Sequence, residues 1–462
     1  MKKLQIVSIL CVLGCMFSII GCTPKKPSPS GSGTTSVSSA NNDVVRSDGT
    51  IDPAGKTDLK GKEILVFGNL IPKKEDANYE EMKEYFDSVC EKLGCTVKCS
   101  EPDSWETFID TFRTQVMAGD FAGDIVAYGT QGYPSLMING LLLPMEGLVD
   151  MSSDLWVKSL QNDLTWKDKL YGVSPNLPQI PNTMIFYNKD LFEEFGIFEK
   201  YDFKKLIAEK KWDWDVFEQL CKDCTKTSGG TTSVWGIGGA GPTGLSLCDN
   251  LIRSNGGDYV KKKGDKVYFS LGDPEAKKAM EFVHKLVWTD KVTGTDNYWA
   301  TWETEKYFRE GLCAMYMNQT FYGADYKKSL DFDFGMLPIP KGPDASDYTA
   351  VALNPVIYGI PANAKNPAPA VAFLEYFIEN HPQRKDGVKA AAMGVAPDDQ
   401  SLEYIEMMST KLHYTFAGYT SLQNLNWSDH GVLTKTPPST IIEQYRAEIQ
   451  GEIDALWSKA DK

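Results

Sequence analysis

Positive charge is scarce in this chain, and it does not gather in one place. The 462 residues contain 48 Lys and Arg against 62 Asp and Glu, which gives a net charge of −14. A surface that binds nucleic acid needs many Lys and Arg side chains together, because it must neutralise several phosphates at once. Only short basic runs such as Lys261–Lys263 occur. The composition therefore argues against nucleic acid and against an anionic membrane surface as partners.

Histidine is also scarce, and motifs that hold metals or catalytic triads are missing. The four histidines show neither the spacing of a zinc site nor that of a zincin or triad motif; they are His284, His381, His413 and His430. Asp331–Gly335 begins like a calcium loop but has Gly342 where the closing Glu would stand. We interpret this stretch as a strand edge with solvated carboxylates, and we expect no metal and no cofactor.

A long hydrophobic run occurs only once, at the N-terminus. Leu4–Ile20 contains 17 residues without a charge, follows two lysines and precedes Gly21 and Cys22. It is shorter than the ~20 residues of a membrane span and is typical of a secretion signal. Ile19–Cys22 resembles the lipobox of bacterial lipoproteins, in which the chain is cut before the Cys and its thiol receives a diacylglycerol. A plain signal peptide with an incidental Cys remains the alternative.

The segment after the signal contains almost nothing that a core could bury. Thr23–Asp58 is rich in Pro, Ser, Thr and Gly, and a flexible coil of this length reaches roughly 30 to 35 Å. We therefore expect residues 1–21 to be a lipoprotein signal peptide and residues 22–58 to be a lipidated Cys22 with a disordered tether. Acyl groups such as palmitate would anchor the protein to the outer face of the cell membrane, since two acyl groups give stable membrane attachment.

Cysteine is present ten times, but the pattern does not indicate a disulfide framework. Three cysteines fall in the signal and at Cys22, which leaves an odd number of seven in the body. Cys221 and Cys224 have C-x-x-C spacing, yet a redox pair belongs at a helix N-terminus. Asp215–Thr225 instead has the pattern of the middle and end of an amphipathic helix. We interpret these residues as reduced, partly buried thiols; a redox or zinc site is the alternative.

The body begins with alternating strand and helix patterns. Short apolar runs predict strands over Glu63–Gly68, Thr96–Cys99 and Asp124–Tyr128. Helical spacing joins them over Ala77–Leu93 and over Ser104–Met117, the latter capped by Ser104. A β-α-β-α-β order implies parallel strands with crossover helices, and therefore an α/β fold.

In such sheets, ligands bind beyond the carboxyl ends of the strands. The first predicted strand is followed by Asn69, and the third ends at Tyr128, with Gly129, Thr130 and Gln131 after it. We therefore expect these polar residues to face a ligand.

Several stretches, taken in order, resemble one known family. They are Met117-Ala-Gly-Asp-x-x-x-Asp-Ile, Asn139-Gly-Leu-Leu-Leu-Pro-Met, Leu170-Tyr-Gly-Val-Ser-Pro, Met184-Ile-Phe-Tyr-Asn-Lys-Asp-Leu-Phe, Trp212-Asp-Trp-Asp, Ser254-Asn-Gly-Gly-Asp, Phe308-Arg-Glu-Gly-Leu-Cys-Ala-Met-Tyr-Met, Phe334-Gly-Met-Leu-Pro-Ile-Pro-Lys-Gly-Pro and Tyr358-Gly-Ile-Pro-Ala-Asn-Ala-Lys-Asn-Pro. Together they resemble the solute-binding proteins of bacterial carbohydrate ABC importers, similar in layout to maltose-binding protein. The resemblance covers roughly Leu59–Gln450.

The resemblance implies a type II periplasmic-binding-protein-like fold, with two α/β lobes that close on a ligand about a hinge. It assigns residues 59–176 plus 320–358 to the N-terminal lobe. Residues 181–317 plus 361–462 form the C-terminal lobe. Locally the sequence agrees, because Pro175, Pro178 and Pro181 interrupt any helix at the first crossing.

A sugar ligand requires flat aromatic rings for its C–H faces and amide or carboxylate groups for its hydroxyls. Trp235, Phe321, Tyr322 and Trp427 are the aromatic candidates that the resemblance directs toward the cleft. Phe321 stands where relatives often have Trp, and Leu353-Asn354-Pro355 where they commonly have a Gly-rich turn. The predicted ligand-binding residues are Asn69, Tyr128, Gln131, Asn176, Trp235, Asn318, Phe321, Tyr322, Asn354 and Trp427.

One further motif indicates a different chemistry. Gly236-Ile-Gly-Gly-Ala-Gly241 matches a dinucleotide-binding fingerprint, with Asp258 at a suitable distance. The run lies in the middle of the chain, and a dinucleotide outside the membrane is not expected. We interpret it as a turn that faces the cleft.

Three functions remain open from the sequence. The preferred one is a monomeric extracellular receptor, not an enzyme, that captures a sugar or oligosaccharide and delivers it to the permease subunits of an ABC importer. The alternatives are a secreted polysaccharide-processing enzyme and a surface protein that binds glycans without a transporter. Paired carboxylates for glycoside hydrolysis can come from anywhere in a chain, so no local pattern selects them.

Overall fold

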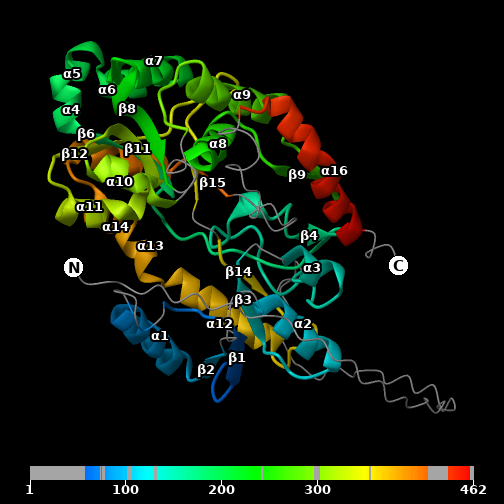
Figure 1. Cartoon of the computed structure of the whole chain (residues 1–462). Helices are drawn as coiled ribbons and strands as arrows, with labels where there is room; N and C mark the ends of the chain where they lie inside the picture. The colour runs from blue at the N-terminus through cyan, green and yellow to red at the C-terminus, as the bar shows by residue number, and fades with distance from the viewer. Residues whose placement is uncertain are drawn as a thin grey trace, which may run out of the picture. The chain divides into compact units, whose positions relative to one another are not determined.

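The computed structural model describes residues 58–72, 74, 79–100, 107–129, 133–240, 243–295, 302–352, 355–414 and 435–457 (Figure 1). The lipidation candidate Cys22 and the predicted ligand residues Gln131, Asn354 and Trp427 lie outside the described residues. Among the described residues, no helix combines the length and the apolar composition that crossing a membrane requires.

The first sheet has four strands in the order β14-β3-β1-β2. Strands β1 (Glu63–Phe67), β2 (Thr96–Ser100) and β3 (Ile125–Tyr128) run parallel, and β14 (Ile357–Gly359) is antiparallel to β3. Helices α1 (Tyr79–Leu93) and α2 (Phe108–Ala118) make the crossovers. The predicted β-α-β-α-β beginning is confirmed.

Helix α2 is described from Phe108, with Thr107 before it, and the Thr107 side chain makes no capping hydrogen bond. The predicted cap Ser104 lies outside the described residues. Phe108 and Phe112 pack edge-on against Phe67, at centroid distances of 4.8 and 5.3 Å. Burial of these rings against β1 therefore holds the first turns of the described helix in place.

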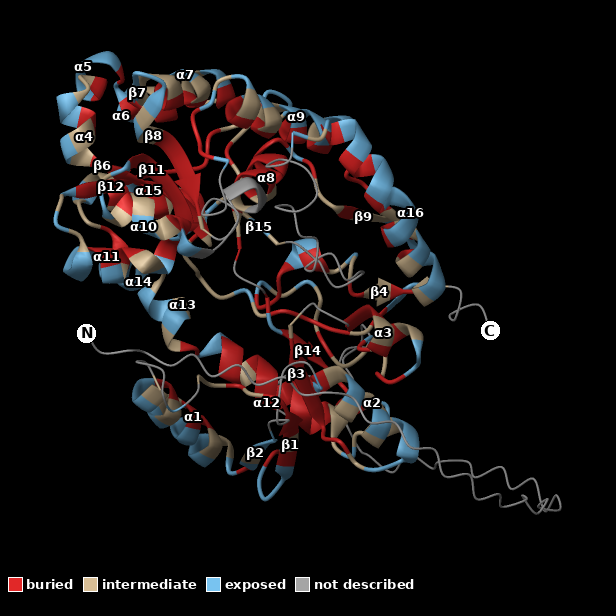
Figure 2. Ribbon diagram, viewed as in Figure 1, coloured by how far each residue is buried: buried red, intermediate tan, exposed pale blue. Residues whose placement is uncertain are grey.

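The second sheet has five strands in the order β12-β6-β11-β8-β7. They are β6 (Thr183–Asn188), β7 (Lys226–Ser228), β8 (Thr231–Gly239), β11 (Cys313–Gln319) and β12 (Phe334–Leu337). Every residue of β6 is buried, and Figure 2 shows the centre of this sheet as almost entirely buried.

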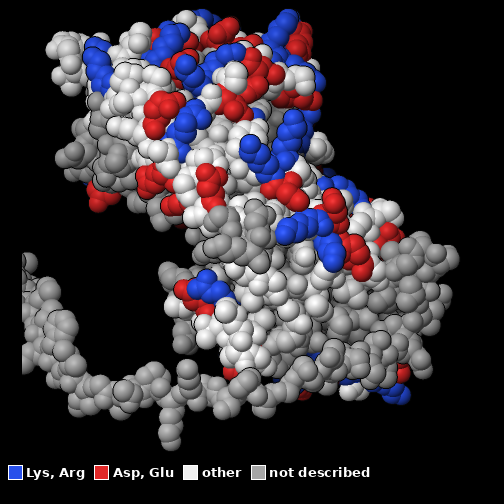
Figure 3. Space-filling model, turned by 90° about the vertical axis from the view of Figure 1, so that its right-hand side faces the viewer, with Lys and Arg blue, Asp and Glu red and all other residues white. Residues whose placement is uncertain are grey.

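Most of the remaining helices accompany the second sheet. They are α4 (Lys189–Glu194), α5 (Ile197–Lys200), α6 (Phe203–Ala208), α7 (Trp214–Cys224), α8 (Thr243–Ser254), α9 (Pro274–Trp288), α10 (Glu305–Arg309), α11 (Gly323–Ser329), α14 (Lys389–Val395), α15 (Asp399–Ser409) and α16 (Pro438–Trp457). A short 3-10 helix, η4 (Thr320–Tyr322), follows β11. Exposed faces of α9 and α16 carry Lys, Arg, Asp and Glu interspersed rather than a basic patch (Figure 3).

The other helices, 3-10 helices and strand pairs complete the fold. They are η1 (Lys158–Leu160), η3 (Trp302–Thr304), α3 (Tyr133–Ile138), α12 (Pro367–Glu379), α13 (Pro382–Asp386) and the paired strands β4 (Thr165–Trp166) with β5 (Lys169–Leu170), β9 (Val260–Lys263) with β10 (Lys266–Phe269), and β13 (Ala350–Val351) with β15 (Leu412–His413).

Two segments pair differently from the expected division into lobes. Strand β12 falls in residues 320–358, expected with the first sheet, but it pairs with β6 in the second. Helix α12 falls in residues 361–462, expected with the second sheet, but it packs on α1. There the Tyr85 hydroxyl donates to the carbonyl oxygen of Phe377. The chain therefore passes between the sheets after β12 and again after α12.

Helix α7 explains the C-x-x-C spacing without a redox site. The Asp213 side chain accepts a hydrogen bond from the Val216 backbone N–H and so caps the helix start. Cys221 and Cys224 lie in the last turns, buried and unpaired with each other. Burial raises the pKa of the Cys224 thiol to about 12. These two thiols are therefore core residues of low reactivity.

The sequence analysis interpreted the glycine run as a turn. That interpretation is wrong for residues 236–239, which are the end of strand β8. A dinucleotide fingerprint needs its glycines in a turn between strand and helix, so the strand also argues against the dinucleotide site that the sequence analysis set aside. A Cβ on Gly236 would stand 2.1 Å from the carbonyl oxygen of Cys221. The glycine instead permits α7 to lie closely against β8.

Gly236→Ala is expected to destabilise the protein by about 1 to 3 kcal/mol, because the added methyl group meets backbone that cannot move aside alone. Gly451→Ala is the matched control, since no atom lies within 4 Å of its added Cβ on α16, and it should stabilise by about 0.5 to 1 kcal/mol. Urea unfolding midpoints measure both. Equal midpoints for the two variants would contradict the packing argument.

His381 holds the junction between α12 and α13. Its Nδ1 accepts a hydrogen bond from the Gln383 backbone N–H at 3.3 Å, and its ring packs edge-on against Tyr85 and Phe377. Burial lowers the pKa of His381 to about 4 from an ordinary value of 6.5. The imidazole is therefore neutral at neutral pH.

This lowered pKa predicts that folding stability falls as the pH drops from about 6.5 to about 4, the His381 value. The unfolded chain binds a proton to His381 in this window and the folded chain does not, so protonation favours unfolding. His381→Asn keeps a side-chain acceptor for the cap but cannot titrate. Its urea midpoint should fall less steeply between pH 7 and pH 4.5 than that of the wild type; parallel curves would contradict the assignment.

Candidate functional site

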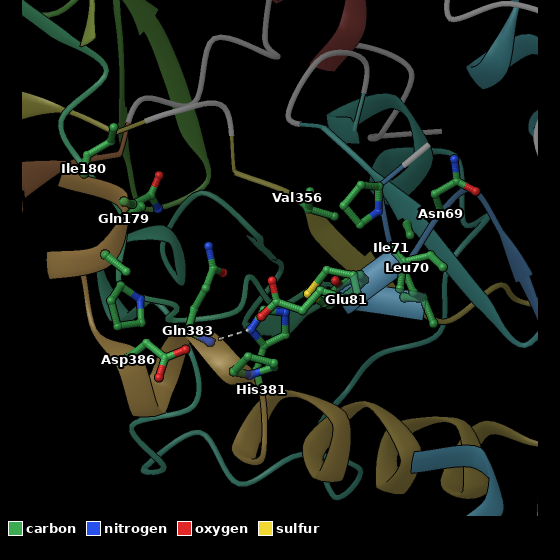
Figure 4. A pocket seen from close by; sticks show the side chains of 18 of the residues that line it. Asn69, Leu70, Ile71, Glu81, Gln179, Ile180, Val356, His381, Gln383 and Asp386 are labelled. Carbon is green, nitrogen blue, oxygen red and sulfur yellow. Dashed lines mark hydrogen bonds between the residues drawn. The ribbon is translucent and has the colours of Figure 1, made fainter. Parts of the chain in front are cut away.

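A cavity of about 850 Å³ lies at the carboxyl ends of β1 and β3. The residues that line it come from the loop after β1, from α1, from the crossing segment before β6, from β14, and from α13 and α14 (Figure 4). They are Asn69, Leu70, Ile71, Pro72, Glu81, Met82, Ala127, Tyr128, Gly129, Pro178, Gln179, Ile180, Val356, Tyr358, His381, Pro382, Gln383, Asp386, Gly387, Ala390 and Ala391. The cavity therefore has the position at which α/β folds bind ligands.

The backbone at the end of β1 is shaped to reach this cavity. Gly68 has φ of +112°, and a Cβ there would stand 2.2 Å from the carbonyl oxygen of Ala127 on β3. Only glycine fits so close an approach at a positive φ. The chain can then leave the sheet at once, and Asn69 becomes the first side chain beyond the strand.

The polar groups of the cavity are amides, carboxylates and one imidazole. Asn69 and Gln383 supply amides that make no side-chain hydrogen bond to any other described residue. Glu81 and Asp386 supply exposed carboxylates, and the neutral His381 adds a ring. Figure 4 shows Gln383 and Asp386 across from Asn69, with Glu81 and His381 between them. These groups can exchange hydrogen bonds with a polar ligand from several directions.

An apolar wall completes the cavity. Leu70, Met82 and Tyr358 are buried, and Ile71 and Val356 are more open. Tyr128 is also buried, and its ring stacks on Phe108 at a centroid distance of 4.1 Å. A mostly apolar lining with a few convergent polar groups is typical of small-molecule sites.

Of the predicted ligand residues, Asn69 and Tyr128 line the cavity together. Three others do not line it and have their polar groups or rings engaged elsewhere. The amide of buried Asn318 donates to the Tyr326 hydroxyl at 2.7 Å and accepts from the Gln319 backbone N–H. Asn176 donates to the Asp154 carbonyl oxygen at 3.0 Å. Trp235, opposite Cys313 in the sheet, is half-buried against the core.

Phe321 and Tyr322 also lie outside the cavity lining, but they form a stacked pair in which Phe321 is exposed and Tyr322 is partly buried. Their rings stack at a centroid distance of 4.8 Å, and the Phe321 side chain is 51% exposed. They belong to η4, which contacts α14, the helix whose first turn contributes Ala390 and Ala391 to the cavity. The exposed ring of Phe321 can stack on an apolar ligand face.

The sequence did not identify Glu81, Gln179, His381, Gln383 or Asp386 as part of a site. Four of them lie on α1 or around α13, where their pattern is that of ordinary solvated helix residues. Only the packing of α12 on α1 brings α13 beside the end of β1. Gln179 had a usable signal, because it is an amide between the prolines of the first crossing, as is Asn176, which the sequence analysis selected.

A second cavity of about 460 Å³ has a different charge. It is lined by Arg253 and Lys261–Lys263 together with Asp258 and Tyr414. The guanidinium of Arg253 pairs with Asp249 and Asp258. Gln179, which lines the first cavity, donates to the Tyr414 hydroxyl at 3.0 Å. This hydrogen bond therefore joins residues of the two cavities.

No group of three or more His, Cys, Asp and Glu among the described residues could hold a metal ion. Asp331 and Asp333, the candidate calcium-loop carboxylates, are exposed just before the edge strand β12. The interpretation as a strand edge with solvated carboxylates is confirmed.

Known proteins resemble this chain over most of its length. The diacetylchitobiose binding protein DasA of Streptomyces coelicolor is 25% identical over 293 residues, which are 63% of this chain and 64% of that protein. A binding protein of Brucella abortus is 23% identical over 333 residues, 71% of this chain and 74% of the relative. A cyclo/maltodextrin-binding protein complexed with maltotetraose superposes with a TM-score of 0.61 at 17% identity, covering 86% of this chain and 98% of that one.

These likenesses show the fold, which is the two-lobed α/β fold of type II periplasmic binding proteins. A family model described as bacterial extracellular solute-binding protein matches residues 74–384, well over half of the chain. The matched range contains the whole second sheet, three of the four strands of the first sheet and most of the cavity lining, whereas β1 and Asn69 precede it and Asp386 follows it. The chain therefore belongs to the family of bacterial extracellular solute-binding proteins.

Proposed function

We propose that the protein is the solute receptor of a carbohydrate ABC importer and that its cargo is a sugar or oligosaccharide. The observation that carries this proposal is the cavity at the ends of β1 and β3. It offers the open amides of Asn69 and Gln383 and the carboxylates of Glu81 and Asp386 beside an apolar wall. Hydroxyl groups need acceptors and donors on several sides, and the C–H faces of a sugar need apolar contact.

The named relatives support a carbohydrate ligand. One is a diacetylchitobiose binding protein, and the structural neighbour was solved with maltotetraose. At 25% and 17% identity these proteins do not fix the cargo of this chain. They favour a saccharide of at least two units, for which a cavity of about 850 Å³ is large enough.

Ligand binding would shift the protein toward a closed form. The crossing segment 171–182 contains no helix or extended strand, and Gln179 within it lines the cavity. A ligand held by this segment and by Asn69 on the other side would stabilise closure, because it contacts both only when they approach. The closed form would then dock on the permease subunits as a monomer and release its cargo there, without chemical change of the ligand.

Family membership places the protein outside the cytoplasm. Attachment there through a lipidated Cys22 is part of this proposal and rests on the sequence of the N-terminal segment. The tether would keep the receptor near its permease while allowing it to turn freely.

The first test of this function is titration calorimetry of the protein against mono-, di- and longer oligosaccharides, followed by chromatography of the sugar. At least one saccharide series should bind and be recovered intact. Asn69→Ala should weaken that binding by about tenfold, because a lost hydrogen bond to a bound ligand costs about 1.4 kcal/mol. Asn139→Ala is the control, since Asn139 is exposed and does not line the cavity. A cleaved sugar would favour the enzyme instead.

The exposed ring of Phe321 provides a second test. Phe321→Ala should weaken saccharide binding by roughly two- to tenfold, if the ring stacks on a sugar face as aromatic platforms do. Phe198→Ala removes another exposed aromatic ring, on α5, that is 44% exposed and lies in a different part of the fold. Affinity unchanged by Phe321→Ala, at an unchanged melting temperature, would remove Phe321 and Tyr322 from the site.

A further inference from the structure

The charged side chains that line the first cavity are all acidic in the described part of the chain. Glu81 comes from the first turn of α1 and Asp386 is the last residue of α13. No Lys or Arg is among the described lining residues, and the imidazole of His381 is neutral because burial lowers its pKa to about 4. At neutral pH the lining therefore carries negative charge only.

Two basic residues close to these carboxylates in sequence are engaged elsewhere, and the exposed Lys385, next to Asp386, does not line the cavity. The guanidinium of Arg384, on α13 itself, donates to the Asn176 carbonyl oxygen at 3.3 Å and to the Asp154 carboxylate at 3.1 Å. Lys83 on α1 pairs with Asp87. Within the described residues, neither Glu81 nor Asp386 has an ion-pair partner. Their charges are thus available to a ligand.

The sequence next to the lining residues adds no excess of positive charge. Residues 130–132 and 353–354 contain no charged residue, and residues 415–434 contain Asp429 and His430 but neither Lys nor Arg. Residues 73–78, between the loop after β1 and α1, contain two lysines balanced by Glu75 and Asp76.

The second cavity does not offset this charge. Arg253 there is paired with Asp249 and Asp258, and Lys261 with Asp273. The ammonium group of Lys262 donates to the carbonyl oxygens of Asn162 and Thr165. Most of its basic groups therefore interact with other groups of the protein. They line a separate cavity, which the Gln179–Tyr414 hydrogen bond joins to the first.

From this arrangement, and resting on the proposed function, we propose that the cavity selects saccharides by charge. It takes neutral sugars, prefers sugars that carry a free, protonated amino group, and rejects uronic acids and sugar phosphates. A ligand carboxylate would stand beside Glu81 or Asp386 without a counter-ion, whereas an ammonium group would meet a carboxylate. Specificity then comes from repulsion of the wrong ligand as much as from attraction of the right one.

The test uses the full-length protein and four β-1,4-linked disaccharides in titration calorimetry at pH 7. These are the glucosamine dimer, its diacetylated form, cellobiose, and the cellobiose analogue oxidised to a uronic acid at the non-reducing unit. The amine should bind roughly three- to tenfold more tightly than the neutral sugars at low salt, and the acid should bind more weakly than these by a similar factor. Both ratios should shrink in 0.5 M NaCl, since salt screens exposed charges.

The double variant Glu81→Gln, Asp386→Asn should bring the amine, neutral and acidic sugars to similar affinities while leaving the melting temperature unchanged. Glu84→Gln, on the same helix but outside the lining, should leave the charge ranking as it is. An acidic sugar that binds the wild type as well as a neutral one does would overturn charge selection but not the receptor function. Absence of binding by every saccharide, at all chain lengths, would instead overturn the proposed function itself.

Discussion

The packing of α12 against α1 is the contact on which the site depends. Helix α12 returns from the far end of the chain, and its Phe373 and Phe377 rings meet Phe86 and Tyr85 of α1. His381 continues this contact and caps α13. Helix α1 is the crossover between β1 and β2. A segment that packs on α1 is therefore also held near the end of β1. The polar side chains of α13 therefore come to lie beside Asn69, some 300 residues away in sequence.

The sequence predicted those features that depend on local patterns. The strands and helices from Glu63 to Tyr128, the helical setting of Cys221 and Cys224, and the family were all within its reach, since hydrophobic periodicity and ordered motifs determine them. Asn69 could be placed because the position follows from parallel topology alone. Predictions failed where a distant partner decides the structure. The glycine run at 236–239 is strand because α7 packs on it, and β12 pairs with β6 rather than joining the first sheet.

The candidate site was accessible to prediction only in part, for the same physical reason. Glu81 and Asp386 look like solvated helix residues, and no pattern in the sequence states that the two helices meet. Trp235 has the chemistry of a sugar platform, but its position opposite Cys313 lies several residues before the carboxyl end of β8. Residue chemistry could thus propose candidates, whereas topology decided which of them share a cavity. The aromatic pair Phe321–Tyr322 is an intermediate case, because Phe321 is exposed and the pair lies beside a cavity helix without lining the cavity.

The exposed placement of the cavity's polar side chains bears on how such receptors diverge. Glu81, Gln383 and Asp386 project from helix surfaces and contribute nothing to the core, whereas the apolar wall of Leu70, Met82 and Tyr358 is buried. Substitution of the polar set carries little penalty in folding free energy. Point mutations can therefore change the ligand of such a receptor while its fold is kept. Relatives at 23% to 25% identity can share this fold without sharing a ligand.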